Sequence, residues 1–159
     1  MNDQHAHKVV VRYANGRTLK GYTFNFSPNR TQFHLFSSVT ADRGELILLK
    51  DLKAVFFVRD FAGDPEHTER TAIDSVPRPA VHAVRVEFLD GEVLCGYTTI
   101  VDLPELGFFF IPVDPESNNV RVFAAVASVR SIMVDSNLVW SHSARTAAEG
   151  PRFSVRGRL

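Results

Sequence analysis

A polar loop in the second half of the sequence carries the side chains best suited to binding a ligand. Residues 112–119 read Pro-Val-Asp-Pro-Glu-Ser-Asn-Asn and lie between two apolar segments. The candidate ligand-binding residues in this loop are Asp114, Ser117, Asn118 and Asn119. Polar groups on a loop that a rigid scaffold positions can form a binding edge. The same residue types also hydrogen-bond their own turns. We favour this turn interpretation and keep the binding edge as the alternative.

Basic residues interspersed with aromatic ones offer a second kind of chemistry near the N-terminus. Residues 1–60 carry nine Lys/Arg against five Asp/Glu, whereas residues 81–135 carry three against eight. Candidate phosphate contacts are Arg12, Arg17, Lys20 and Arg30. Basic grooves with aromatic stacking platforms bind single-stranded nucleic acid, so Sm-like RNA binding is one hypothesis. Against it, strand alternation would bury most of the aromatic residues, and the chain has zero net charge. The oppositely charged halves could attract each other, or a partner could use one of them, but we favour chance variation of charge on solvated faces.

Two arginines near the C-terminus offer a third kind of chemistry. Arg152 and Arg156 lie in the string Gly-Pro-Arg-Phe-Ser-Val-Arg-Gly-Arg-Leu, which resembles the Arg-x-x-x-Arg entry segment of the PilZ domain, a bacterial cyclic-di-GMP receptor. The resemblance implies that both guanidinium groups grip the guanines and phosphates of the ligand, a task that suits a planar, permanently charged group. The family's other motif, Asp/Asn-x-Ser-x-x-Gly, is approached only at residues 25–27, where Arg30 stands in place of the glycine.

Motifs for catalysis are absent from the sequence. It contains no Gly-rich phosphate loop, His-Glu-x-x-His, Gly-x-Ser-x-Gly or paired cysteines. The single cysteine, Cys95, lies within a predicted strand, and we expect an inert, buried thiol. His5 and His7 offer only two metal ligands near a chain end, which is too few for a site. We therefore expect neither an enzyme nor a bound cofactor or metal.

An internal repeat organises the elements that must position these residues. Residues 9–23 and 84–98 share valines, an aromatic residue, a turn and a Gly-Tyr-Thr triplet at an offset of 75 (91 − 16). Their period-two alternation predicts strands. Asn15-Gly16 and Asp90-Gly91 predict two-residue type I′ hairpin turns, in which both residues have positive φ. A glycine inside each second predicted strand indicates a sharp bend or the close approach of another backbone, and we attribute both glycines to the bend of a tightly curled small barrel.

Further apolar segments complete five predicted strands in each repeat. The fifth strands, residues 52–58 and 126–134, align best at an offset of 74 (126 − 52), which predicts the loss of one residue before the second of them. Five short antiparallel strands without a long helix are typical of a small barrel. We therefore predict an all-β protein of two tandem five-stranded Sm/SH3-like barrels that pack on each other. The predicted divisions are a first barrel at 8–60, a linker at 61–80, a second barrel at 81–135 and a tail at 136–159, whose residues 137–140 could form one more strand or an anchor.

The strings of both repeats resemble those of an uncharacterised bacterial family of tandem small β-barrels found near, or fused to, PilZ-type signalling modules. The resemblance rests on Leu-Lys-Ala-Val-Phe-Phe-Val-Arg-Asp-Phe at 52–61 and on Asp-Gly-Glu, Gly-Tyr-Thr, Gly-Phe-Phe and Ser-Asn-Asn in the second repeat. It implies a non-enzymatic ligand- or protein-binding adaptor in bacterial signalling. A cyclic-di-GMP receptor acting through Arg152 and Arg156 is the alternative, beside RNA binding.

The location and partners follow from what the sequence lacks. The first seven residues do not resemble a signal peptide, and the longest apolar run, 108–113, is too short to span a membrane. We therefore expect a soluble, cytoplasmic protein with no membrane partner. Cyclic-di-GMP or another protein is the expected partner, and the oligomeric state, including a homodimer, is left open.

Overall fold

Strands account for almost all of the regular structure in the computed structural model, which describes residues 5–70, 81–99 and 105–142. The first half contains β1 (His7–Tyr13), β2 (Thr18–Thr23), β3 (Gln32–Leu35), β4 (Glu45–Leu48), the 3₁₀ turn η1 (Leu49–Asp51) and β5 (Leu52–Val58). The second half contains β6 (His82–Phe88), β7 (Val93–Thr98), β8 (Gly107–Pro112), β9 (Asn119–Ala125), the 3₁₀ turn η2 (Val126–Ser128), β10 (Val129–Val134) and β11 (Asn137–Ser141). The all-β prediction is confirmed.

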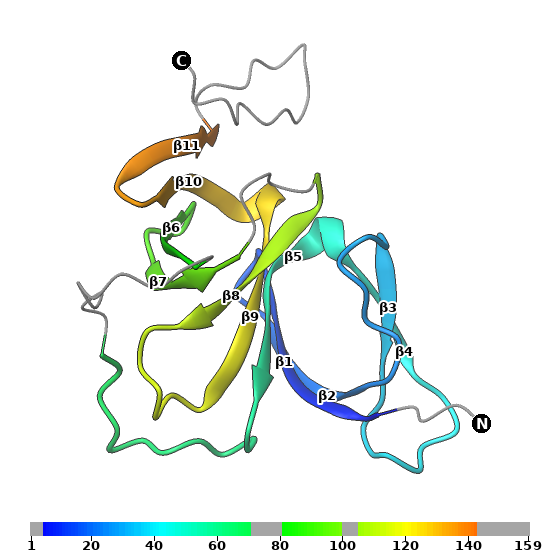
Figure 1. The fold of residues 1–159 in the computed structure, drawn as a ribbon. Coiled ribbons are helices and arrows are strands. Elements are labelled where there is room, and N and C mark those ends of the chain that lie inside the picture. The colour runs from blue at the N-terminus through cyan, green and yellow to red at the C-terminus, as the bar shows by residue number, and fades with distance from the viewer. Residues whose placement is uncertain (1–4, 71–80, 100–104, 143–159) are drawn as a thin grey trace.

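The strands form one large antiparallel sheet and one small one. The large sheet has nine strands in the order β11-β10-β6-β7-β8-β9-β5-β1-β2, and β3 and β4 pair separately. A bridge between Tyr22 and Phe36 links the small sheet to β2. No barrel closes among the described residues, and two separate barrels are not confirmed, because β5 of the first half pairs with β9 of the second. These two strands run through the middle of the molecule (Figure 1).

The two halves pair their equivalent strands in the same way. β1 pairs with β2 and β5, and β6 pairs with β7 and β10. Val9 lies opposite Phe57, and its counterpart Val84 lies opposite Val134. The fifth strands therefore correspond at an offset of 77 (134 − 57), and the predicted offset of 74 is wrong. The second half has gained two residues before its fifth strand rather than lost one.

The hairpin turns differ from the predicted type. Tyr13 N–H donates to the Arg17 carbonyl at 2.8 Å, so three residues separate the paired positions, and Phe88 and Glu92 repeat the bond at 2.8 Å. Gly16 and Gly91 have φ of +92° and +94°, but the residues before them do not have positive φ. This is the three-residue loop in which one glycine forms a bulge, not the two-residue type I′ turn. Positive φ at two successive residues occurs instead between β10 and β11, at Asp135 and Ser136.

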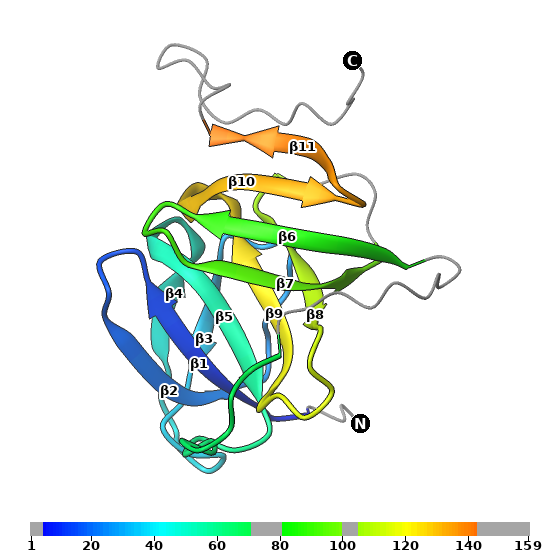
Figure 2. The same cartoon turned by 90° about the vertical axis from the view of Figure 1, so that its left-hand side faces the viewer.

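β5 separates two hydrophobic cores. All seven of its residues are buried, as expected for a strand covered on both faces. Val55 and Phe57 pack into the core of the first half, with β1, β3 and β4. Phe56 and Val58 point the other way, into a core built from β6, β8, β9, β10 and β11. Figure 2 shows the stack of β6, β10 and β11 that covers this second core.

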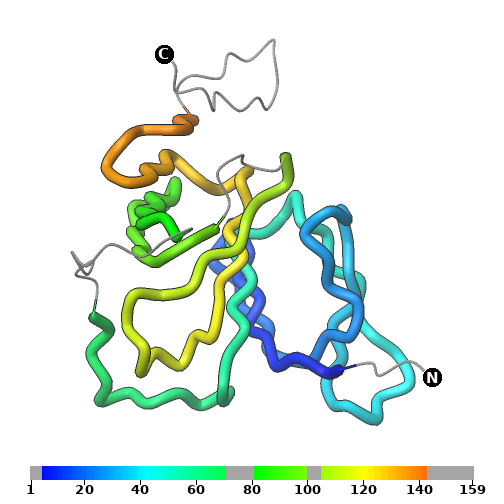
Figure 3. The backbone as a smooth tube through the Cα atoms, in the orientation of Figure 1, coloured from blue at the N-terminus to red at the C-terminus, as the bar shows by residue number. Residues whose placement is uncertain are grey.

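Of the two alternatives for residues 137–140, a further strand or an anchor, the strand is present as β11 (Asn137–Ser141). It pairs with the outer edge of β10, and its Trp140 is buried in the second core. Residues 143–159 of the predicted tail, including Arg152 and Arg156, lie outside the described residues and are drawn in grey in Figure 3. Within the described ranges, no helix has the length and apolar character needed to cross a bilayer.

Candidate ligand-binding groove

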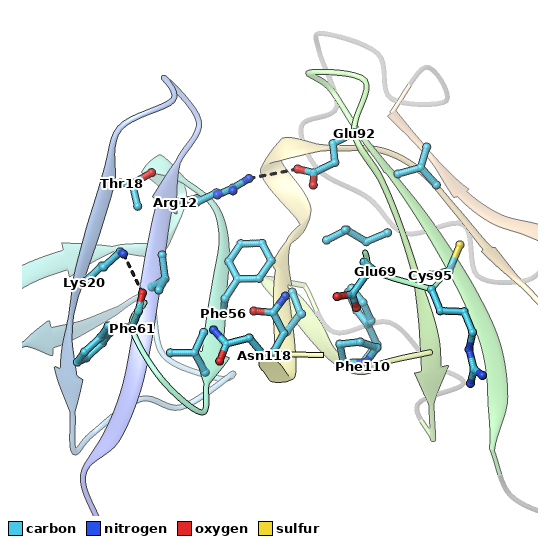
Figure 4. A pocket seen from close by; sticks show the side chains of 18 residues that line it. Arg12, Thr18, Lys20, Phe56, Phe61, Glu69, Glu92, Cys95, Phe110 and Asn118 are labelled. Carbon is cyan, nitrogen blue, oxygen red and sulfur yellow. Dashed lines mark hydrogen bonds and ion pairs between the residues drawn. The ribbon is translucent and has the colours of Figure 1, made fainter. Parts of the chain in front are cut away.

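A groove with a volume of about 530 Å³ lies between the two halves of the protein. One wall comes from β1 and β2, where Val10 pairs with Lys20 and Arg12 with Thr18. Strand alternation places these four side chains on one face of the hairpin, away from the first core. β7 and β8 form the facing wall, as Figure 4 shows.

The floor of the groove is apolar. Phe56 and Val58 of β5 lie beside Val122 of β9, and Leu94 and Phe110 extend the apolar surface toward the second half. These residues belong to the second core or pack against it, so the floor rests on rigid sheet. A ligand with a flat or apolar part would therefore find a preformed surface there.

A network of charges joins the two halves at one end of the groove. Arg12 pairs with Glu92 at 3.3 Å across the gap, and this pair is drawn in Figure 4. Lys53 Nζ lies 2.6 Å from Asp90 and also donates to Glu92, although the Lys53 residue is only 6% exposed. The Lys53 hydrogen bond is the main cause that lowers the pKa of the Asp90 carboxyl. These pairs join a basic residue of the first half to an acidic residue of the second half in each case.

Lys20 is the cation best placed to meet an anionic ligand. Its Nζ donates to the Phe61 carbonyl at 2.9 Å, and Lys20 forms no ion pair with a carboxylate of the described residues. Arg12 lies on the same wall, 5.3 Å from the centre of the Phe56 ring. The groove thus combines an apolar floor with positive charge on one wall.

Cys95 lines the opposite wall of the groove. It is partly rather than fully buried, which corrects the expectation of a buried thiol. Burial nevertheless raises the pKa of the thiol above its ordinary value. A raised pKa leaves less thiolate at neutral pH and so disfavours nucleophilic chemistry.

The predicted polar loop hydrogen-bonds its own turn. Asp114 Oδ1 accepts a bond from the Glu116 N–H at 2.9 Å, and Ser117 Oγ accepts one from the Asn119 N–H at 3.0 Å. Asn118 holds the segment after β5, because its side chain donates to the Asp60 carbonyl at 2.8 Å and accepts from the Asp60 N–H at 3.2 Å. Asn118 and Asn119 also line one end of the groove. Ligand binding by these four residues stays a prediction.

The four candidate phosphate contacts do not share one surface. Arg12 and Lys20 line the groove. Arg17 instead pairs with Glu45 at 3.5 Å and lies over the Tyr13 ring at 4.6 Å. Arg30 is exposed in the loop between β2 and β3. Only two of the four therefore lie on one common surface.

Sequence reasoning missed the buried Lys53 and its two acidic partners. Asp90 and Glu92 flank Gly91, and their pattern predicts only a turn. The available signal was Lys53 itself, a single charge in the apolar run Leu-Lys-Ala-Val-Phe-Phe-Val. A lysine in a buried strand requires a partner.

These features define an all-β protein with a ligand-sized groove between two joined halves. Residues 5–135 match the model of a family of unknown function, DUF6982, and the chain belongs to this family. No curated protein matches the chain. No solved structure matches it either.

Proposed function

We propose that this protein is a non-enzymatic binding module whose ligand is a small organic anion with a flat, apolar part. The observation that carries the proposal is the groove of about 530 Å³, with its apolar floor and Lys20 on its wall. Small-molecule sites are typically concave, mostly apolar and provided with a few polar groups that orient the ligand. We also propose an adaptor role in bacterial signalling, which the sequence resemblance supports, and a cytoplasmic location.

Each half is, on this proposal, a partly open relative of the five-stranded Sm/SH3-like barrel. Support comes from the pairing of each first strand with the second and fifth strands of its own half. A 3₁₀ turn also precedes each fifth strand. The ligand would then bind on the outer face of the first barrel, where the second barrel supplies the opposite wall.

Cyclic-di-GMP is the candidate ligand that the sequence and the groove both favour. It carries flat bases that suit the apolar floor and phosphates that suit Lys20 and Arg12. Arg152 and Arg156 lie in the segment that resembles a PilZ entry sequence. The ligand could therefore contact the groove, the C-terminal arginines, or both.

Titration calorimetry with cyclic-di-GMP distinguishes these sites. Lys20→Gln removes the charge but retains a donor for the Phe61 carbonyl, and Arg17→Gln is the matched control on the same hairpin, outside the groove. We expect binding that Lys20→Gln weakens roughly ten-fold, equivalent to about 1.4 kcal/mol, and that Arg17→Gln leaves unchanged. Binding abolished by Arg152→Ala with Arg156→Ala but unaffected by Lys20→Gln would assign the ligand to the C-terminal segment and refute the groove as its site.

A further inference from the structure

A cluster of metal-ligating side chains forms where the segment after β5 folds against the loop between β8 and β9. His67 and Glu69 come from the first segment and Asp114 from the second. One ligand atom from each residue lies within 4.8 Å of the other two. The closest approach is between His67 Nε2 and Asp114 Oδ2, at 2.7 Å.

Asp114 is a buried and fixed member of this cluster. It is only 7% exposed. The backbone N–H of Arg70 donates to its Oδ2 at 2.9 Å, and that of Glu116 donates to its Oδ1 at 2.9 Å. The carboxylate is therefore held in place by both loops before any ion binds. Such preorganisation reduces the cost of assembling a metal site.

The other two members are accessible from solvent. His67 is partly buried and Glu69 is exposed, and both line a polar hollow of about 520 Å³ at the protein surface. A metal ion could reach the cluster through this hollow. Two ligands that each lie about 2.1 Å from a zinc ion are at most about 4.2 Å apart. Binding one ion therefore requires two adjustments: the exposed Glu69 side chain rotates inward, and His67 Nε2 and Asp114 Oδ2, which lie 2.7 Å apart, separate to the roughly 3.4 Å between two tetrahedral zinc ligands.

We propose that His67, Glu69 and Asp114 bind a divalent transition-metal ion, with Zn²⁺ as the ion that fits the donor set. One imidazole nitrogen and two carboxylate oxygens are ordinary zinc ligands, and three protein ligands leave one position for water. His67 binds the ion as neutral imidazole, so a proton on the nitrogen that coordinates the metal must move to the other ring nitrogen or to solvent when the metal enters. The ion would join the segment after β5 to the β8–β9 loop, at the end of the groove that Glu69 also lines.

The chain contains a natural comparison for this cluster. His82 Nδ1 lies 2.6 Å from Asp135 Oδ2, so these residues form a second histidine–aspartate pair like that of His67 and Asp114. Within the described residues, no third histidine, cysteine or carboxylate ligand lies close enough to complete a cluster there. His82→Ala is therefore the matched control for His67→Ala. The double variant His5→Ala with His7→Ala controls for adventitious binding at the N-terminal histidines, whose rings lie 5.9 Å apart.

The test is a zinc titration of the full chain in competition with a chromophoric chelator, with the thermal midpoint as a second measurement. We expect one Zn²⁺ per chain and a rise in the thermal midpoint on adding the ion, because a ligand that binds only the folded state stabilises it. His67→Ala and Glu69→Gln should each weaken binding roughly ten-fold or more, since even supporting residues of metal sites have effects of that size. His82→Ala and the His5/His7 double variant should bind as the parent does.

Three results would overturn the proposal. The first is no zinc binding by the parent chain. The second is binding that His67→Ala leaves unchanged, or that the His5/His7 double variant abolishes. The third is Ca²⁺ binding as tightly as Zn²⁺ and without dependence on His67, since Ca²⁺ selects oxygen ligands.

Discussion

Gly21 and Gly96 occupy equivalent places in the two halves, each in a second strand that lies against the third. A Cβ at Gly21 would lie 2.5 Å from the Phe36 carbonyl oxygen, and one at Gly96 would lie closer still to the Ile111 carbonyl oxygen. Both are far inside van der Waals contact. The close backbone approach, which was the alternative to the bend favoured from the sequence, is therefore present at both positions, and it explains why a glycine interrupts each strand.

Replacing Gly96 with alanine should destabilise the protein. The added methyl group would overlap backbone rather than a flexible side chain, so β7 and β8 must separate. We expect the free energy of unfolding to fall by about 1–3 kcal/mol, the usual cost of overpacking. Urea denaturation measures this change. Thr99→Ala, at an exposed position just after β7, should stay within about 0.5 kcal/mol of the parent, and an equally stable Gly96→Ala would contradict the close approach.

Asp90 should make the stability of the protein depend on acid pH. The hydrogen bond from Lys53 holds the pKa of the Asp90 carboxyl below its ordinary value of 3.8. Because the folded-state pKa is the lower one, the stabilisation is present above the unfolded-state pKa and is lost as pH falls through the folded-state pKa. The free energy of unfolding should therefore decline from about pH 5 to about pH 2, and less steeply in Asp90→Asn. Identical slopes for parent and variant would contradict this account.

At the scale of elements, strand β11 contributes to the second core through one large side chain. Trp140 is 2% exposed and packs there, whereas Leu138 on the same strand is 57% exposed. We expect Trp140→Ala to lower the free energy of unfolding by about 3–5 kcal/mol, as for other buried tryptophans. Leu138→Ala, the control, should change it by no more than about 0.5 kcal/mol. Similar losses in both variants, measured by thermal or urea unfolding, would show that β11 is not anchored through its tryptophan.

The turns show how far local sequence patterns could predict the elements. Asn15-Gly16 and Asp90-Gly91 marked both hairpins correctly, but glycine supplies a positive φ to either turn type, so the dipeptide did not decide loop length. The type I′-like pair Asp135-Ser136 contains no glycine and gave no signal. The wrong offset of the fifth strands has a similar cause. The alignment of apolar residues placed the start of the second half's fifth strand at Val126, but Val126–Ser128 form the 3₁₀ turn η2. Only the pairing register shows which residues belong to the strand.

At the scale of the whole molecule, the sequence predicted the strands and their repetition but not how the halves join. Alternation predicts which face of a strand is buried, not which distant strand is its partner. The one signal was the continuous apolar run Ala-Val-Phe-Phe-Val in β5, which is typical of a strand buried on both faces. The groove could not be predicted from the sequence either, because the residues of its two walls lie about 80 positions apart, as Arg12 and Glu92 do.

The charge network that joins the halves provides a test of their docking. The double variant Asp90→Asn with Glu92→Gln leaves Lys53, which is 6% exposed, without a carboxylate partner. Loss of the counter-charges destabilises a buried lysine, but the amide oxygens that replace the carboxylates still accept its hydrogen bonds, so we expect a loss of about 1–3 kcal/mol in urea denaturation. Lys53→Met should cost less, because it removes the buried charge and leaves the two half-exposed acids to solvent. The reverse order would contradict the proposed role of Lys53.

The central claim is that the groove between the halves receives an organic anion with a flat, apolar part. The most direct measurement is a fluorescence titration with 8-anilinonaphthalene-1-sulfonate, a probe that combines aromatic rings with a sulfonate. We predict one saturable site, weakened roughly ten-fold in Lys20→Gln, equivalent to about 1.4 kcal/mol, and unchanged in Arg17→Gln. No saturable binding, or binding equally strong in the Lys20→Gln protein, would contradict the claim.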